Sequence, residues 1–185
     1  MEDPVTLVLT AVGTIAGVAS AYLAHVAVRG RIRRPRGEAP RPPEPRESHD
    51  VFVSYAAAEA DVAERLARDL EEAGASVFLV RWVEPGLRPL LEAERALAGA
   101  ALGVLLFGPG TMADARIQDE YAALLTGVYE RGLRFVPART EDVTLPGFAA
   151  IRQPVDLTEP GGPRYAAEVA RLAEIATRLR GGTGA

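Results

Sequence analysis

The stretch HDVFVSY, residues 49–55, decides the fold of this 185-residue chain. Three consecutive apolar residues between an acid and a serine predict a short strand buried on both faces of a sheet. A helix is predicted after this strand, because Ala63, Leu66 and Leu70 recur at intervals of three and four residues. Gly74 stands where the C-cap of that helix is expected. A buried strand that leads into an amphipathic helix is the first unit of an α/β domain.

The same alternation continues along the chain. Further strands are predicted at 77–80, 102–107, near 135–137 and near 154–157, and further helices at about 90–98, from Thr111 onward, and at about 164–180. Thr111 and Asp114 have the spacing of a capping box that opens the middle helix. We therefore expect a flavodoxin-like, doubly wound α/β fold. Its parallel five-stranded sheet has the order 2-1-3-4-5, with a crevice at the carboxyl ends of strands one and three.

An apolar segment, residues 5–28, precedes this domain. As a helix it is about 36 Å long, enough for a hydrocarbon core of about 30 Å. Glu2 and Asp3 come before it and five arginines follow it between residues 29 and 36, which predicts a single-pass membrane helix with the rest of the chain in the cytoplasm. The alternative is a buried or interfacial helix of a soluble protein.

The chain divides into five predicted segments. They are a short tail at 1–4, the membrane helix at 5–28, a basic and then proline-rich linker at 29–48, the α/β domain at 49–180 and a flexible tail at 181–185. Five prolines among charged residues make the second part of the linker semi-extended.

The composition excludes several kinds of chemistry. The net charge of −4 argues against nucleic acid as a partner, and the absence of cysteine excludes disulfides, a thiolate nucleophile and a cysteine metal site. No lysine occurs, which removes a Walker-type phosphate lysine and a Schiff base. Only His25 and His49 are present, far apart, so neither a metal site nor a histidine-based triad is expected.

Five short motifs in this order resemble the TIR (Toll/interleukin-1 receptor) domain family over about residues 49–180. DVFVSY at 50–55 is similar to the family's first box, and Pro85-Gly86 is similar to its BB loop. The strand at 135–137, Leu145-Pro146 and the strand at 155–157 follow the family's closing pattern. The remaining alternative is another flavodoxin-like fold.

Glu120 is the candidate catalytic residue. On a helix it shares one side with Ile117 and Leu124, so its carboxylate lies on or beside the buried stripe, near the crevice. The alternative is a rim residue that points outward, and Asp119 is interpreted as an ordinary solvated acid. Glu59 and Asp61 are interpreted as first-turn acids that interact with a helix dipole.

The resemblance implies a reaction for Glu120. TIR domains that hydrolyse NAD+ carry a glutamate four residues after a tryptophan, and the spacing here puts Glu120 on that glutamate and Arg116 on that tryptophan. NAD+ is then the substrate, no cofactor or metal is needed, and the product is ADP-ribose or a cyclic form. The BB loop is expected to add an arginine for phosphate and a tryptophan for stacking. The expected substrate-binding residues are Ser54, Tyr55, Arg81, Trp82 and Arg116.

Departures from the enzyme pattern keep other functions open. Besides Arg116, Ala56 and Ala57 replace residues that are often basic in catalytic members, and Leu79 replaces a frequent aspartate. The first hypothesis is a membrane-anchored cytoplasmic signalling or defence effector, an NAD+ glycohydrolase activated by self-assembly. The second is a non-catalytic scaffold that acts through TIR–TIR contacts. A third is a base–sugar-bond enzyme that resembles deoxyribosyltransferases.

Overall fold

The strand β1 (Val51–Ser54) lies inside a parallel sheet, between β2 (Val77–Leu79) and β3 (Leu102–Phe107). The computed structural model describes residues 49–182. Beyond β3 the sheet continues with β4 (Arg134–Arg139) and β5 (Val155–Asp156), and every pairing is parallel. The resulting order, β2-β1-β3-β4-β5, confirms the predicted topology.

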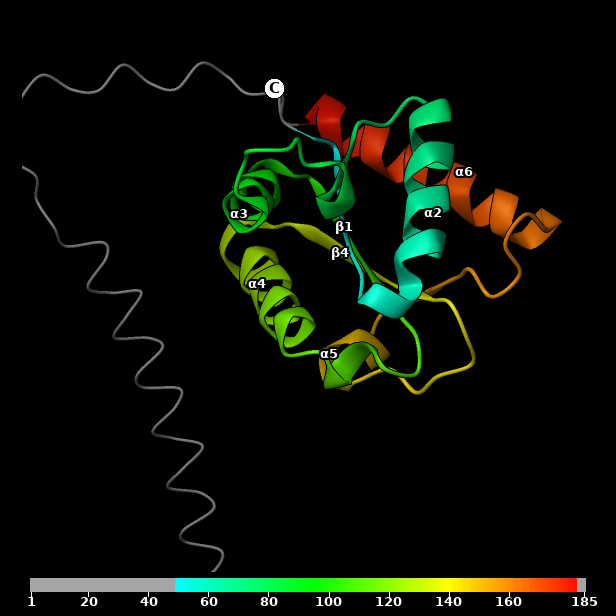
Figure 1. Cartoon of the computed structure of the whole chain (residues 1–185). Helices are drawn as coiled ribbons and strands as arrows, with labels where there is room; N and C mark the ends of the chain where they lie inside the picture. Colours follow the sequence, from blue (N-terminus) through cyan, green and yellow to red (C-terminus); the bar gives the residue numbers. More distant parts are fainter. Residues whose placement is uncertain (1–48, 183–185) are drawn as a thin grey trace, which may run out of the picture. The chain divides into compact units, whose positions relative to one another are not determined.

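Helices cover both faces of this sheet (Figure 1). One face carries α2 (Ala60–Glu72) and α6 (Pro163–Gly182), and the other carries α3 (Pro89–Gly99), α4 (Ala115–Arg131) and the short α5 (Gly147–Ala150). Three 3-10 turns follow the first three strands: η1 (Ala57–Glu59), η2 (Val80–Trp82) and η3 (Thr111–Ala113).

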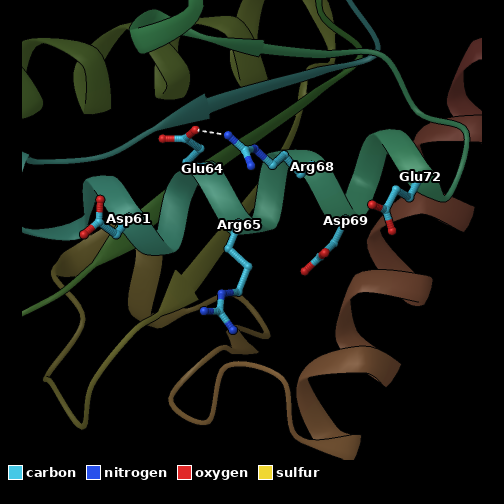
Figure 2. A pocket seen from close by; sticks show the side chains of 6 residues that line it. All are labelled: Asp61, Glu64, Arg65, Arg68, Asp69 and Glu72. Atoms are coloured by element: carbon cyan, nitrogen blue, oxygen red, sulfur yellow. Dashed lines mark hydrogen bonds and ion pairs between the residues drawn. The ribbon is translucent and has the colours of Figure 1, made fainter.

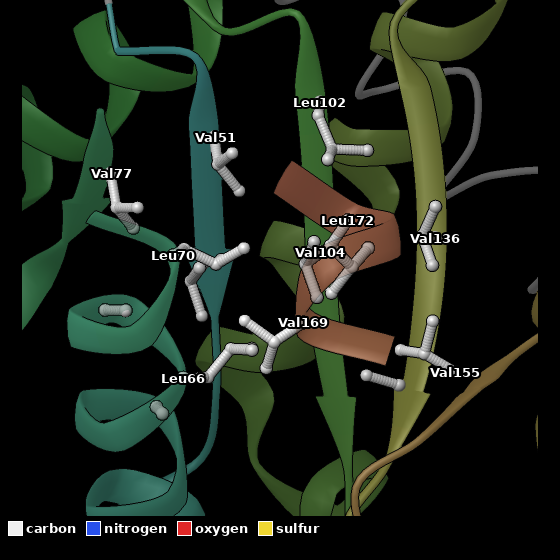
Figure 3. Packing of buried hydrophobic residues seen from close by; sticks show 14 of the residues in the cluster. Val51, Leu66, Leu70, Val77, Leu102, Val104, Val136, Val155, Val169 and Leu172 are labelled. Atoms are coloured by element: carbon white, nitrogen blue, oxygen red, sulfur yellow. The ribbon is translucent and has the colours of Figure 1, made fainter. Parts of the chain in front are cut away.

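The core lies on both sides of the sheet, which explains why the strands are apolar without a break. Val51 and Val53 pack on the side of α2 and α6, whereas Phe52 packs on the side of α3 and α4, because side chains alternate along a strand. Figure 3 shows Leu66 and Leu70 of α2 packed over the strands, and both are fully buried. Truncating such a leucine to alanine costs about 2–5 kcal/mol.

The start of α4 differs from its prediction. Asp114 alone is the N-cap, and its carboxylate accepts hydrogen bonds from the backbone N–H groups of Arg116 at 2.9 Å and Ile117 at 3.4 Å. Thr111 lies a turn earlier, fully buried in η3, where its hydroxyl accepts a hydrogen bond from the N–H of Gly108 at 2.7 Å. The predicted capping box is therefore wrong: Thr111 is not the N-cap, and Asp114 takes that role in place of the third helical position, because the chain makes one extra turn after β3 before the helix begins.

The last helix, α6, continues to Gly182, two residues past the predicted end of the domain at 180. Within residues 49–182 no helix is long and apolar enough to cross a bilayer. The predicted membrane helix at 5–28 and the linker at 29–48 lie outside the described residues.

Candidate active site

Glu120 lies where α4 passes the carboxyl end of β1. The helix packs on the sheet through Ile117, Tyr121 and Leu124, all buried, and Glu120 follows from the same side with its side chain 16% exposed. Ser54, the last residue of β1 and itself buried, donates its hydroxyl hydrogen bond to Oε2 of Glu120. The fold thus joins two predicted site residues that are 66 positions apart in the sequence.

Arg116 occupies the other oxygen of the same carboxylate. One turn before Glu120 on α4, it places Nη1 against Oε1 in an ion pair. Its Nη2 donates to the backbone carbonyl of Tyr55 at 2.8 Å, so the guanidinium links α4 to the loop after β1. The side chain of Arg116 is 42% exposed, and the pair therefore lies at the mouth of the site rather than in its floor.

Tyr55 contacts Arg116 through its backbone carbonyl, whereas its ring is buried in the core. The side chain is 5% exposed and belongs to the core cluster under α2 and α6. Burial raises the pKa of the Tyr55 hydroxyl, against the opposing effects of a backbone hydrogen bond from Arg81 and of the positive charges of Arg116 and Arg81. The phenol is accordingly neutral at physiological pH.

Arg81 and Trp82 lie in η2, and their side chains make other contacts. Arg81 pairs with Asp61 at 3.2 Å and with Glu64 at 3.0 Å, on the outer surface of α2. Trp82 is half-buried and packs against the core cluster beneath α2 and α6. Within the described part of the chain, no hydrogen bond or ion pair joins either residue to Glu120.

Glu59 was predicted as a first-turn acid that interacts with a helix dipole, and it lies in η1, directly before α2. The prediction did not include its burial: the residue is 4% exposed, whereas the side chain of Asp61 is 98% exposed. Among residues 49–182, Oε2 of Glu59 has no hydrogen-bond partner. Burial raises the pKa of this carboxyl, and the nearby charge of Glu141 raises it further.

The carboxyl of Glu59 packs against the loop that follows β3. A Cβ at Gly108 would lie 2.1 Å from Oε1 of Glu59, so a larger residue there requires the Glu59 carboxyl to move. Glu59 therefore brings the loop after β1, which begins at Tyr55, against the loop that leads into α4. The sequence signal was available in the alanines at 56–58 and 60, which surround this acid with apolar neighbours.

Three residues that depart from the enzyme pattern supply no charged group to the site. Ala56 is buried and Ala57 is exposed, so no basic side chain follows Tyr55 at the mouth of the site. Leu79 is 1% exposed and belongs to the core cluster of α2 and α6. Residues 49–182 hold no cluster of three or more histidines or acids that is suited to a metal ion.

A separate hollow of about 350 Å³ lies along the outside of α2, and Figure 2 shows the charged side chains that line it. Glu64 is paired with Arg68, and Asp69 accepts a hydrogen bond from the Tyr165 hydroxyl at 2.6 Å. The hollow's lining of four acids and two arginines is a charged helix face with an excess of negative charge. The hollow has no residue in common with the carboxylate of Glu120 and its partners.

Solved structures share this fold at low sequence identity. The TIR domain of the Toll-related receptor TRR-2 from Hydra magnipapillata has a TM-score of 0.55 and 20% identity, covering 69% of this chain and 99% of that one. A metazoan TIR-STING receptor from C. gigas, in complex with 2',3'-cGAMP, has a TM-score of 0.55 and 15% identity, covering 68% and 39%. A diflavin flavoprotein A3 from Nostoc sp. has a TM-score of 0.50 and 15% identity, covering 75% and 99%.

The sequence comparisons are more specific than the shared fold. No curated protein sequence matches this chain significantly. A family model described as TIR domain matches residues 51–173, which is more than half of the chain and spans β1 through most of α6. The chain therefore belongs to the TIR domain family.

Proposed function

We propose that this TIR domain cleaves the nicotinamide–ribose bond of NAD+, with Glu120 as its catalytic residue. The observation that carries the proposal is the carboxylate itself. It is 16% exposed, lies at the carboxyl end of β1, and has both oxygens held, by Ser54 and Arg116. A carboxylate that is oriented before the substrate arrives is suited to stabilising charge that develops in a transition state.

The chemistry requires little besides this group. As the bond to nicotinamide lengthens, the ribose gains oxocarbenium character, and a negative carboxylate in a poorly hydrated site stabilises it. Nicotinamide leaves as a neutral base, so no general acid has to protonate it. Attack of water on the ribosyl cation gives ADP-ribose, and attack by a group of the same molecule gives a cyclic product. Ser54 is proposed to hold the carboxylate in one orientation.

Self-assembly is proposed to complete the site. The segment from η2 to the start of α3 exposes three leucines: Leu87 at 48%, Leu90 at 74% and Leu91 at 38%. Exposed apolar side chains grouped on one loop are suited to a protein interface. Arg81 can reach a substrate phosphate only after its ion pairs with Asp61 and Glu64 break. Surface ion pairs of this kind contribute about 0–1 kcal/mol, so formation of an interface can break them.

Membrane anchoring through residues 5–28 is part of the same proposal. A tether that holds copies in one plane raises their local concentration and favours assembly without any new contact. Arginine-rich flanking sequence after residue 28 assigns the domain to the cytoplasm. The test is extraction of membranes from expressing cells. The full chain should enter solution only with detergent, and recovery in the detergent-free soluble fraction contradicts the anchor.

A scaffold function is the second candidate, and one observation favours it. The carboxylate of Glu120 is already paired with Arg116, while the leucines at 87, 90 and 91 are open to a partner. In this alternative the contacts from Ser54 to Glu120 and from Arg116 to the Tyr55 carbonyl stabilise α4 against β1, and the domain acts only by recruiting other TIR domains.

Nicotinamide release separates the two candidates. The full chain is displayed on lipid vesicles, its assembly is verified by cross-linking, and nicotinamide is measured by chromatography after addition of NAD+. Release is expected from the wild type and from Asp119→Ala, whose exposed acid is the matched control, and not from Glu120→Ala. No release from assembled wild-type protein supports the scaffold, and release that survives Glu120→Ala removes Glu120 from the mechanism.

A further inference from the structure

The carboxylate proposed to act on the substrate is covered by an arginine of its own helix. Arg116 holds Oε1 of Glu120 with Nη1 and the Tyr55 carbonyl with Nη2, while Ser54 holds Oε2. Each carboxylate oxygen keeps a second lone-pair site, so a ribose hydroxyl can approach Glu120, but it then shares the carboxylate with a guanidinium that already balances its charge. The uncompensated negative charge of Glu120 becomes available to the ribose only when the arginine contact opens. The two contacts differ in how easily that happens.

The arginine contact is the one that can open. Ser54 is 1% exposed and fixed in β1, whereas the side chain of Arg116 is 42% exposed on a long, flexible stem. Ion pairs at the surface are weak and screened by salt, so a competing anion can replace the carboxylate. A guanidinium presents a planar fork of donors that matches phosphate oxygens as well as carboxylate oxygens.

We infer that Arg116 is the specificity-determining residue of this site: it covers Glu120 in the ligand-free protein and exchanges that carboxylate for a phosphate oxygen of the substrate. The inference rests on the proposed function, because it takes Glu120 as the group that contacts the ribose. The ligand class that follows is a ribosyl compound that bears a phosphate or diphosphate. A phosphate-free nucleoside must break the Arg116–Glu120 pair without offering the guanidinium a new partner.

Two ligands that differ in phosphate test this exchange. ADP-ribose carries a diphosphate and adenosine is a neutral ribosyl compound without phosphate, and binding of each to the full chain is measured by titration calorimetry. Arg116→Ala should weaken ADP-ribose about tenfold, the equivalent of one charged hydrogen bond, and should strengthen adenosine because Glu120 is then uncovered. Arg116→Lys keeps the charge without the fork and should be intermediate for ADP-ribose.

The matched control is Arg178→Ala. Arg178 also forms an ion pair with a glutamate four positions away, Glu174, but on α6 and with both side chains at least 70% exposed. Arg178→Ala removes the same charge from the domain as Arg116→Ala does, and it should leave the affinities for both ligands unchanged. Circular dichroism of every variant checks that the fold is retained.

Opposite changes for the two ligands support the inference, and parallel changes overturn it. If Arg116→Ala weakens both ligands, Arg116 is a structural link between α4 and β1. If it strengthens both, Arg116 only blocks the site and does not recognise phosphate. Wild-type protein that binds neither ligand also overturns it. Because calorimetry does not need turnover, opposite changes without nicotinamide release leave the exchange standing and remove the proposed hydrolysis.

Discussion

Two glutamates near the end of β1 have opposite surroundings. Glu120, on α4, has both carboxylate oxygens partnered, and its side chain is 16% exposed. Glu59, in the turn η1, is 4% exposed, and its Oε2 has no hydrogen-bond partner in the described part of the chain. The first carboxylate is paired with a positive charge and reachable, whereas the second is enclosed and has no cationic partner among the described residues.

The difference shows that one small region holds a glutamate suited to catalysis and another suited to a structural role. A carboxylate held by a serine and an arginine at the surface can exchange those partners for a ligand. A carboxyl enclosed beside Gly108 has no such freedom, and burial favours its neutral form. We therefore expect substitutions at Glu120 to change activity and substitutions around Glu59 to change stability.

The largest expected effect separates the two residues by activity. Glu120→Gln keeps a group that accepts the Ser54 hydrogen bond but removes the negative charge, and NAD+ cleavage should fall by a factor of about 10²–10³ in kcat. Glu59→Gln, the same chemical change at the buried position, should retain most of the cleavage rate. Initial rates on vesicle-bound full chain measure both. Equal losses in the two variants contradict the division of roles.

The next effect concerns the space around Glu59. Gly108→Ala places a Cβ 2.1 Å from Oε1 of Glu59, so the carboxyl must move, and the substitution should lower the free energy of unfolding by about 1–3 kcal/mol. Gly110→Ala is the control, since a Cβ there meets nothing within 4 Å. In urea unfolding, adding Glu59→Ala to Gly108→Ala should recover part of the loss. Strictly additive losses argue that the two residues do not touch.

A smaller effect is expected at the helix start that positions Glu120. Asp114→Ala removes the side chain that caps the N–H groups of Arg116 and Ile117 and should cost about 1 kcal/mol of unfolding free energy. Asp119→Ala, on the exposed side of the same helix, should stay within about 0.5 kcal/mol of the wild type. Thermal unfolding of the two variants measures this difference. An equal loss of stability in both contradicts a capping role for Asp114.

The smallest effect is a pH dependence. Burial, helped by the charge of Glu141, raises the pKa of Glu59 above its value in the unfolded chain, so the folded state binds more protons between these two values. Stability from this group is fully present below the unfolded pKa and is lost as pH rises through the folded pKa. Glu59→Gln should flatten that decline. Urea unfolding from pH 4 upward measures it, and identical pH profiles for variant and wild type contradict a raised pKa.

Much of the fold could be predicted because it depends on local patterns. Alternation of short apolar runs with helical spacing indicated a parallel sheet and its order, and the structure confirms both. The start of α4 could not be placed as well, since Thr111 and Asp114 both match a cap, and only the packing of the loop after β3 separates them. The burial of Glu59 was not predicted because a first-turn acid looks the same whether it points to water or to a neighbouring loop.

The stretch at residues 49–55 shows which features depend on the sequence alone and which depend on the tertiary structure. By itself the sequence determined that β1 is buried on both faces, that Glu120 follows the buried stripe of its helix, and that cysteine and lysine chemistry is absent. Only the tertiary structure decided that Ser54 and Arg116 hold Glu120 from opposite sides, and that Glu59 is enclosed against Gly108. Periodicity encodes which face of an element is buried, whereas contacts between residues 66 positions apart depend on how whole elements pack.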